Sequence, residues 1–186
     1  MAMTPSSMVQ LGTKAPDFSL VDTVSGKILS LDELKGAKAT VIMFICNHCP
    51  YVIHLREAIV AVANQFSDKG VSFVAISSND AVAYPEDSPA KMKEIATSYH
   101  FLFPYLFDET QAVAKAYDAA CTPDFFVYNG KMLLKYRGQF DDSRPSNQVT
   151  PSGKDLAAAI DAICSGNEPD KLQKPSIGCN IKWRKA

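Results

Sequence analysis

The residues best suited to chemistry lie in the tetrapeptide Cys46-Asn47-His48-Cys49. Two cysteines separated by two residues on a helical turn bring their sulfurs close enough to form a reversible disulfide. The tetrapeptide follows a buried strand pattern and precedes a helical one, and the amides and partial positive charge of a helix N-terminus favour a thiolate. His48 adds a titratable cation that lowers the thiol pKa further. The sequence therefore predicts a redox-active thiol pair with Cys46, Cys49 and His48 as catalytic residues.

Two other interpretations of these cysteines stay open. They are either buried core residues that happen to have this spacing, or half of a zinc site. Zinc usually takes a second Cys/His pair at short spacing, and none follows in the sequence. His54 and His100 are isolated, and we interpret them as ordinary surface or partly buried residues. We predict no metal at the site.

Composition narrows the class of protein. A chain of 186 residues with 47% hydrophobic and 21% charged residues is typical of one soluble globular domain. The formal charge of −1 offers no field to attract nucleic acid or an anionic membrane. Residues 1–13 lack the pattern of a secretory signal, and no apolar run is long enough to span a bilayer. Together with five cysteines, an odd number, this predicts a reducing, cytoplasmic location.

The hydrophobic pattern predicts the elements that position the thiol pair. Strands are expected over residues 40–45, 71–76, 104–107, 124–128 and 132–136. Helices are expected over 51–66, 89–100, 109–117 and 152–164, the last capped by Ser152. Asn129-Gly130 predicts a hairpin, and Asp141-Asp142 a solvated turn. The order predicts an α/β fold with a mixed central sheet flanked by helices.

These elements and their motifs resemble the thioredoxin-like superfamily, in which a CxxC motif at a helix start is followed by a βαβ unit, a Thr-Pro pair and a hairpin. The segments Ala15–Leu20, Gly26-Lys27 and Ser30–Gly36 are similar to the opening of the redoxin group, the alkyl hydroperoxide reductase/thiol-specific antioxidant family and its allied disulfide reductases. The resemblance covers a domain at residues 10–165. It implies a thioredoxin-like fold with an N-terminal redoxin-type extension, and residues 166–186 are expected to form a C-terminal tail.

The resemblance also implies roles for site residues. Cys46 would be the attacking thiol, Cys49 the resolving thiol, and Pro123 a cis-proline facing them. Thr122 would offer its backbone to an extended substrate by strand addition. The implied activity is thiol–disulfide exchange without a cofactor. The implied partners are a protein or small-molecule disulfide, or a peroxide, and an external thiol reductant.

The sequence departs from two patterns of the superfamily. Thioredoxins have Trp before the first cysteine and Gly-Pro between the two, where this chain has Ile45 and Asn47-His48. Peroxiredoxins carry Pro-x-x-x-Thr-x-x-Cys; with Cys49 aligned to their cysteine, the proline and threonine positions hold Ile42 and Cys46. No arginine directly precedes the 124–128 strand. The alternative functions are a peroxiredoxin-like thiol peroxidase and a copper- or zinc-binding thioredoxin-fold module.

Three further cysteines have different settings. Cys121 directly precedes Thr122-Pro123, which places it near the CxxC motif if the resemblance holds. Cys179 lies in the tail, and a tail cysteine that folds back can resolve or relay a disulfide. Cys121 and Cys179 are therefore possible additional redox residues. Cys164, beside apolar residues of the last helix, is expected to be a core residue.

Overall fold

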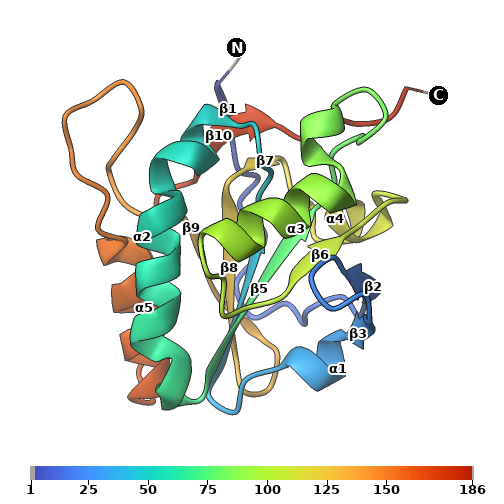
Figure 1. The fold of residues 1–186 in the computed structure, drawn as a ribbon. Coiled ribbons are helices and arrows are strands. Elements are labelled where there is room, and N and C mark those ends of the chain that lie inside the picture. The colour runs from blue at the N-terminus through green and yellow to red at the C-terminus, as the bar shows by residue number, and fades with distance from the viewer. Residues whose placement is uncertain (1–2, 186) are drawn as a thin grey trace.

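The computed structural model describes residues 3–185, and its centre is a seven-stranded mixed sheet (Figure 1). Across this sheet the order is β3 (Ile28–Ser30), β2 (Ser19–Asp22), β6 (Tyr105–Phe107), β5 (Val71–Ser77), β4 (Ala39–Phe44), β8 (Asp124–Asn129) and β9 (Leu134–Gly138). The pairs β4/β5 and β5/β6 are parallel, and the other neighbours are antiparallel. The predicted mixed sheet and the hairpin at Asn129 are confirmed.

Helices cover both faces of this sheet. The helices α2 (Pro50–Phe66), α3 (Pro89–Ser98) and α5 (Lys154–Cys164) pack on one face. The shorter helices α1 (Leu31–Leu34) and α4 (Ala112–Ala116) lie with the other face, and two 3-10 turns are η1 (Ser67–Lys69) and η2 (Pro85–Asp87). Alternate side chains of a strand point to opposite faces, so β4, which is buried on both faces, is apolar at every position except Thr40.

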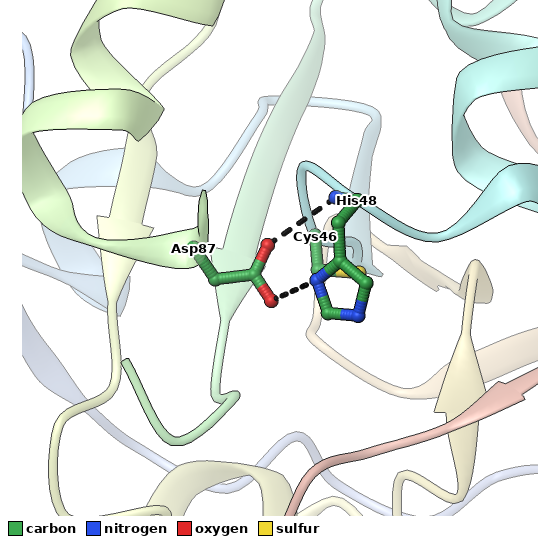
Figure 2. A group of neighbouring side chains, drawn as sticks. All are labelled: Cys46, His48 and Asp87. Carbon is green, nitrogen blue, oxygen red and sulfur yellow. Dashed lines mark hydrogen bonds and ion pairs between the residues drawn. The ribbon is translucent and has the colours of Figure 1, made fainter. Parts of the chain in front are cut away.

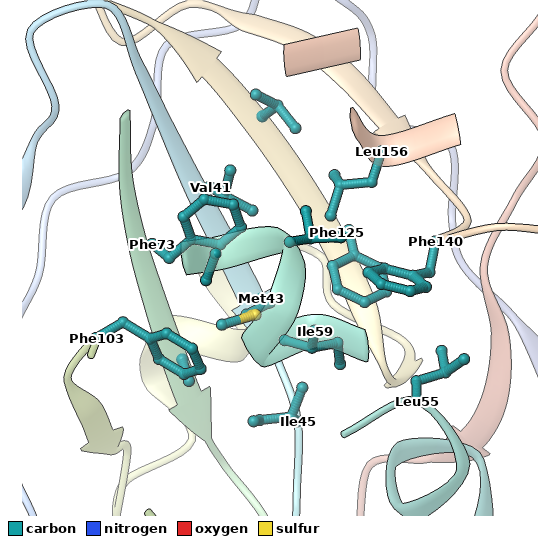
Figure 3. Packing of buried hydrophobic residues seen from close by; sticks show 14 of the residues in the cluster. Val41, Met43, Ile45, Leu55, Ile59, Phe73, Phe103, Phe125, Phe140 and Leu156 are labelled. Atoms are coloured by element: carbon teal, nitrogen blue, oxygen red, sulfur yellow. The ribbon is translucent and has the colours of Figure 1, made fainter. Parts of the chain in front are cut away.

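The larger core cluster lies between the central sheet and α2 and α5 (Figure 3). Val41 and Met43 of β4 point into it, whereas Ile42 and Phe44 point into the second cluster on the opposite face. Both clusters therefore hold β4 in place. This anchors the end of the strand that leads into the CxxC motif.

A second, three-stranded sheet contains β1 (Met3–Pro5), β10 (Ile177–Asn180) and β7 (Cys121–Thr122), with both pairs antiparallel. Figure 1 shows it above the N-terminal end of α2. The sequence pattern predicted no strand within residues 166–186. Four residues that include a glycine carry too little periodicity to identify a strand, and tertiary pairing decides their conformation.

The start of α5 differs from the prediction. Ser152 does not cap the helix, because the N-cap position is held by Gly153 in a left-handed conformation, φ 67°. Instead, Asp141 Oδ2 accepts hydrogen bonds from the Ser152 and Gly153 amides, at 2.6 and 2.7 Å. Asp141 is buried, so the expected solvated turn is wrong at this residue. A carboxylate is favoured beside the amides of a helix start.

Within residues 3–185, no helix has both the length and the apolar character required to cross a bilayer.

Candidate active site

The CxxC motif lies at the junction of β4 and α2. The Ile45 amide donates to the Ile76 carbonyl at 3.0 Å, which extends the pairing of β4 with β5 up to the motif. Cys49 is the N-cap of α2, and Pro50 occupies its first turn, where a missing amide does no harm. Both cysteines are buried, Cys46 at 2% exposure and Cys49 at 0%.

Thr122 contacts both sulfurs of the motif. Cys46 Sγ lies 3.4 Å from the Thr122 hydroxyl, and the Cys49 thiol donates to the Thr122 carbonyl at 3.1 Å. The Thr122–Pro123 peptide bond is cis, as the resemblance implies. The structure thus brings together four residues singled out from the sequence, from segments more than seventy positions apart along the chain.

The two thiols interact as one titrating pair. The hydrogen bond from the Cys46 thiol lowers the pKa of Cys49 well below its usual range, against the effect of burial, and contacts with Cys179, Thr122 and the Val52 amide act in the same direction. The pKa of Cys46 is raised by the same hydrogen bond, by burial and by the charge of Asp87. The first ionisation therefore falls on Cys49 while Cys46 keeps its proton, and the two thiols titrate as a pair.

His48 is paired with an acid that the sequence did not indicate. Its Nδ1 lies 2.7 Å from Oδ2 of Asp87 in an ion pair (Figure 2). Its ring stacks on Tyr84 with 5.4 Å between centroids. The Asp87 carboxylate is fully buried. Asp87 thus places a buried carboxylate beside the His48 ring, and the expected effect of His48 on the thiols has to act in the presence of this acid.

Asp87 also holds the backbone of the motif. Its Oδ1 accepts from the Asn47 amide at 2.8 Å, and its Oδ2 accepts from the Asn79 side chain at 2.7 Å. An anion at the amides that precede a helix is electrostatically favourable, but it repels a thiolate nearby. Asp87 therefore orders the loop while opposing the ionisation of Cys46.

Replacing Asp87 with asparagine is expected to lower the pKa of Cys46, because a repelling charge is removed while a carbonyl oxygen remains for the amides. Alkylation of Cys46 by iodoacetamide, followed by mass spectrometry as a function of pH, should then shift to lower pH than in the wild type. Asp80→Asn is the matched control, because it makes the same change at an acid that pairs with Arg184, at 3.8 Å, and not with His48. An unchanged Cys46 profile in Asp87→Asn would contradict this electrostatic role.

Asn47 is held by three hydrogen-bond partners, of which Tyr105 and Arg56 are buried. Its side chain donates to the Glu86 carbonyl at 2.7 Å and accepts from the Tyr105 hydroxyl at 3.1 Å. Its own carbonyl accepts from the Arg56 guanidinium at 2.8 Å. The motif is therefore rigidly connected to α2, β6 and η2. Sequence reasoning missed these partners, and the only signal, for Glu86 alone, was a loop sequence of mixed polarity directly after a buried strand.

Three side chains of the site carry atoms that could bind a metal ion. One ligand atom each from Cys46, His48 and Asp87 lies within 4.8 Å of the others. Thiolate, imidazole and carboxylate are all ligands of zinc, which usually takes four in a structural site. Asp87 already accepts two backbone or side-chain donors, so metal binding would compete with the contacts that order the motif.

The backbone of Thr122 is already paired. In the second sheet Thr122 lies opposite Cys179 of β10, so the tail takes one edge of β7. Gly178 approaches so closely that a Cβ atom there would lie 2.0 Å from the Thr122 oxygen. The strand addition by substrate that the resemblance implies is therefore not available at this edge while β10 is in place.

The other two cysteines have more ordinary settings. Cys121 is buried, its thiol donates to the Pro123 carbonyl at 3.6 Å, and burial together with Asp124 raises its pKa, which disfavours its thiolate. Cys164 is partly buried and packs against the larger core cluster.

A buried ion pair supports the other face of β8. Arg137 and Asp124 are both fully buried, and their nearest N–O distance is 3.0 Å. The Arg137 guanidinium also donates to the carbonyls of Tyr117 and Asp118 and lies 3.9 Å from the ring centre of Phe126. Because the Arg137 guanidinium makes these buried contacts, it stabilises the fold and does not bind a substrate oxygen.

An open groove of about 950 Å³ leads past the ring that stacks on His48. It is lined by residues of the 80–84 loop and of the tail, among them Tyr84, Lys182 and Trp183. Because Tyr84 belongs to both the groove and the His48 stack, a molecule in the groove lies next to the active site.

Comparisons with known proteins identify the family and the fold of this chain. The model of the AhpC/TSA family matches residues 11–137. An uncharacterized conserved protein from Geobacillus kaustophilus is 52% identical, with a TM-score of 0.98 over 100% of this chain and 98% of that one. A hypothetical protein from Sinorhizobium meliloti 1021 is 46% identical, with a TM-score of 0.96 over 98% of this chain and 100% of that one.

A more distant solved structure shows the fold alone. Peroxidoxin BcpB from Mycobacterium tuberculosis is 19% identical, with a TM-score of 0.63 over 86% of this chain and 98% of that one. No curated protein matches this chain. The predicted thioredoxin-like fold is confirmed, and the chain belongs to the AhpC/TSA family of thiol oxidoreductases and peroxidases.

Proposed function

We propose that this protein is a thiol–disulfide oxidoreductase that uses Cys46 and Cys49 as its dithiol. The observation that carries the proposal is the hydrogen-bonded thiol pair, with both sulfurs against Thr122 and one pKa lowered by the other thiol. A pair that shares one proton supplies a thiolate and a second thiol at the same place, and both are needed for disulfide exchange. The proposed location is the cytoplasm, where an external thiol can restore the dithiol.

In the proposed mechanism Cys46 attacks first. As its sulfur bonds to one sulfur of a substrate disulfide, its proton passes along the hydrogen bond to the Cys49 sulfur, and the other substrate sulfur leaves as a thiolate. Cys49 then attacks the Cys46 sulfur of the mixed disulfide, its proton goes to the leaving thiolate, and the reduced substrate departs. The protein is left with a Cys46–Cys49 disulfide, which two equivalents of an external thiol reduce.

The surroundings assign supporting roles. His48, which contacts Asp87 and Tyr84, is positioned to give a proton to the departing substrate thiolate. Thr122 and Pro123 form the wall against both sulfurs. The groove beside Tyr84 gives a substrate its approach. Residues 10–165 form the proposed catalytic domain, and the 166–186 segment covers one side of the site through β10.

A direct competition tests the proposal. Fully reduced protein is mixed with oxidised glutathione in one sample and with stoichiometric hydrogen peroxide in another, and thiol content and intact mass are followed with time. We expect rapid exchange with the disulfide at Cys46, ending in a two-proton mass loss, and slow reaction with peroxide. Fast peroxide consumption beside slow disulfide exchange would contradict the proposal.

A thiol peroxidase is the second candidate. The contact that favours it is the Thr122 hydroxyl, 3.4 Å from Cys46 Sγ, because a hydroxyl beside the sulfur can hold a peroxide oxygen. In that reaction Cys46 would be oxidised to a sulfenic acid, and Cys49 would condense with it to form a disulfide and water. The peroxide sample of the same experiment tests this candidate.

A further inference from the structure

A third thiol lies against the CxxC pair. Cys179 of β10 is buried, and its thiol donates a hydrogen bond to the sulfur of Cys49. Cys49 therefore has one thiol on each side, Cys46 in its own loop and Cys179 in the tail strand. In Figure 1, β10 lies beside β7 at the N-terminal end of α2, the end that carries Cys49.

The fold holds Cys179 in this place through contacts on both sides of β10. Cys179 pairs with Thr122 of β7 and with Met3 of β1. Ser6 and Ser176 exchange hydrogen bonds, the Ser6 amide donating to the Ser176 carbonyl at 2.9 Å and the Ser176 amide to the Ser6 hydroxyl at 3.0 Å. The close approach of Gly178 to the Thr122 oxygen leaves no room for a side chain.

We propose that Cys179 is a third redox-active residue, which accepts the disulfide from the CxxC pair and releases Cys46. This rests on the proposed function, since the disulfide must first form between Cys46 and Cys49. The geometry carries the step, because Cys179 lies opposite Thr122, whose carbonyl accepts a hydrogen bond from the Cys49 thiol at 3.1 Å, and Cys49 is not the sulfur that meets the substrate.

The step is an internal exchange without net oxidation. Burial raises the pKa of Cys179, so its thiol loses its proton as its sulfur attacks the Cys49 sulfur of the Cys46–Cys49 disulfide. A Cys49–Cys179 bond forms, the Cys46–Cys49 bond breaks, and Cys46 leaves as a thiolate that takes up the proton lost by Cys179. The oxidised protein then holds its disulfide between α2 and β10, with Cys46 again a thiol.

Mapping the disulfide of the oxidised protein tests the proposal. The full chain is treated with oxidised glutathione, alkylated with iodoacetamide, and digested with trypsin without reduction. Cys46 and Cys49 lie together in peptide 39–56, and Cys179 lies in peptide 172–182. We expect the two peptides to be linked through Cys49, with Cys46 alkylated. In Cys179→Ser the link should be lost, peptide 39–56 should carry an internal disulfide, and Cys46 should escape alkylation.

Cys164→Ser is the matched control and should keep the link, because Cys164 lies at the far end of α5. An internal disulfide in wild-type peptide 39–56, with Cys179 alkylated, would overturn the relay and leave the proposed function intact. Linkage of Cys49 to Cys121 would also overturn it. If glutathione leaves all five thiols alkylated, the proposed function itself fails.

Discussion

Replacing Cys46 with serine should abolish disulfide reduction, with a loss on the order of 10³-fold or more, since the attacking sulfur is removed. Cys49→Ser should instead stop the reaction after its first step, because no thiol remains beside Cys46 in the motif to release the substrate. Turnover with oxidised glutathione measures the first effect. Intact mass measures the second, as a glutathione adduct that persists on Cys46.

Cys164→Ser serves as the control here as well and should keep wild-type turnover, since Cys164 packs against the core away from the motif. The reverse pattern, with an inactive Cys49→Ser that forms no adduct and an adduct in Cys46→Ser, would exchange the two roles. The lowered pKa of Cys49 makes that comparison informative, because the more easily ionised thiol is the one to which the resolving role is given.

Arg137→Met should cost about 3–5 kcal/mol in the free energy of unfolding, because Asp124 would be left as a buried charge without its partner. The variant also leaves the Tyr117 and Asp118 carbonyls without the guanidinium. Urea unfolding followed by far-UV circular dichroism measures the loss as a lower midpoint.

Lys135→Met is the matched control for Arg137→Met. Lys135 lies on the same strand and pairs with the exposed Glu168 at 2.6 Å, and such surface pairs contribute about 0–1 kcal/mol. The double variant Asp124→Leu, Arg137→Met should recover part of the loss, because neither charge is then buried alone. Equal midpoints for Arg137→Met and Lys135→Met would show that the buried ion pair contributes no more to the free energy of unfolding than the surface pair does.

The sequence was sufficient for the elements that carry strong periodic signals. The apolar run 40–45 and the helical spacing of 51–66 correspond to β4 and α2, and their junction is the place where the CxxC motif was expected. The cis conformation of the Thr122–Pro123 bond was predicted from the resemblance to the thioredoxin-like superfamily and not from the spacing of residues. These signals are local, because each depends on residues within a few positions of one another.

The parts that could not be predicted depend on residues that meet only after folding. Asp87 could not be identified as the partner of His48, because it is one of three acids in the segment 77–88 and its sequence neighbours do not distinguish it from a surface acid. The Asp141 carboxylate caps α5 from outside the helix, which a search for a local capping pattern does not detect. Cys179 was suspected only as a cysteine in a tail, and the strand that positions it has no sequence signal.

Strand β10 also determines when the site can exist during synthesis. Met3 and Cys179 pair across nearly the whole described chain, and this pairing forms more readily once the intervening domain has folded, because the unfolded loop carries a closure entropy cost. While a ribosome has yet to release residues 177–180, the nascent chain carries the CxxC pair without its third thiol and with the β7 edge uncovered. The thiols are thus most accessible to other proteins before translation is complete.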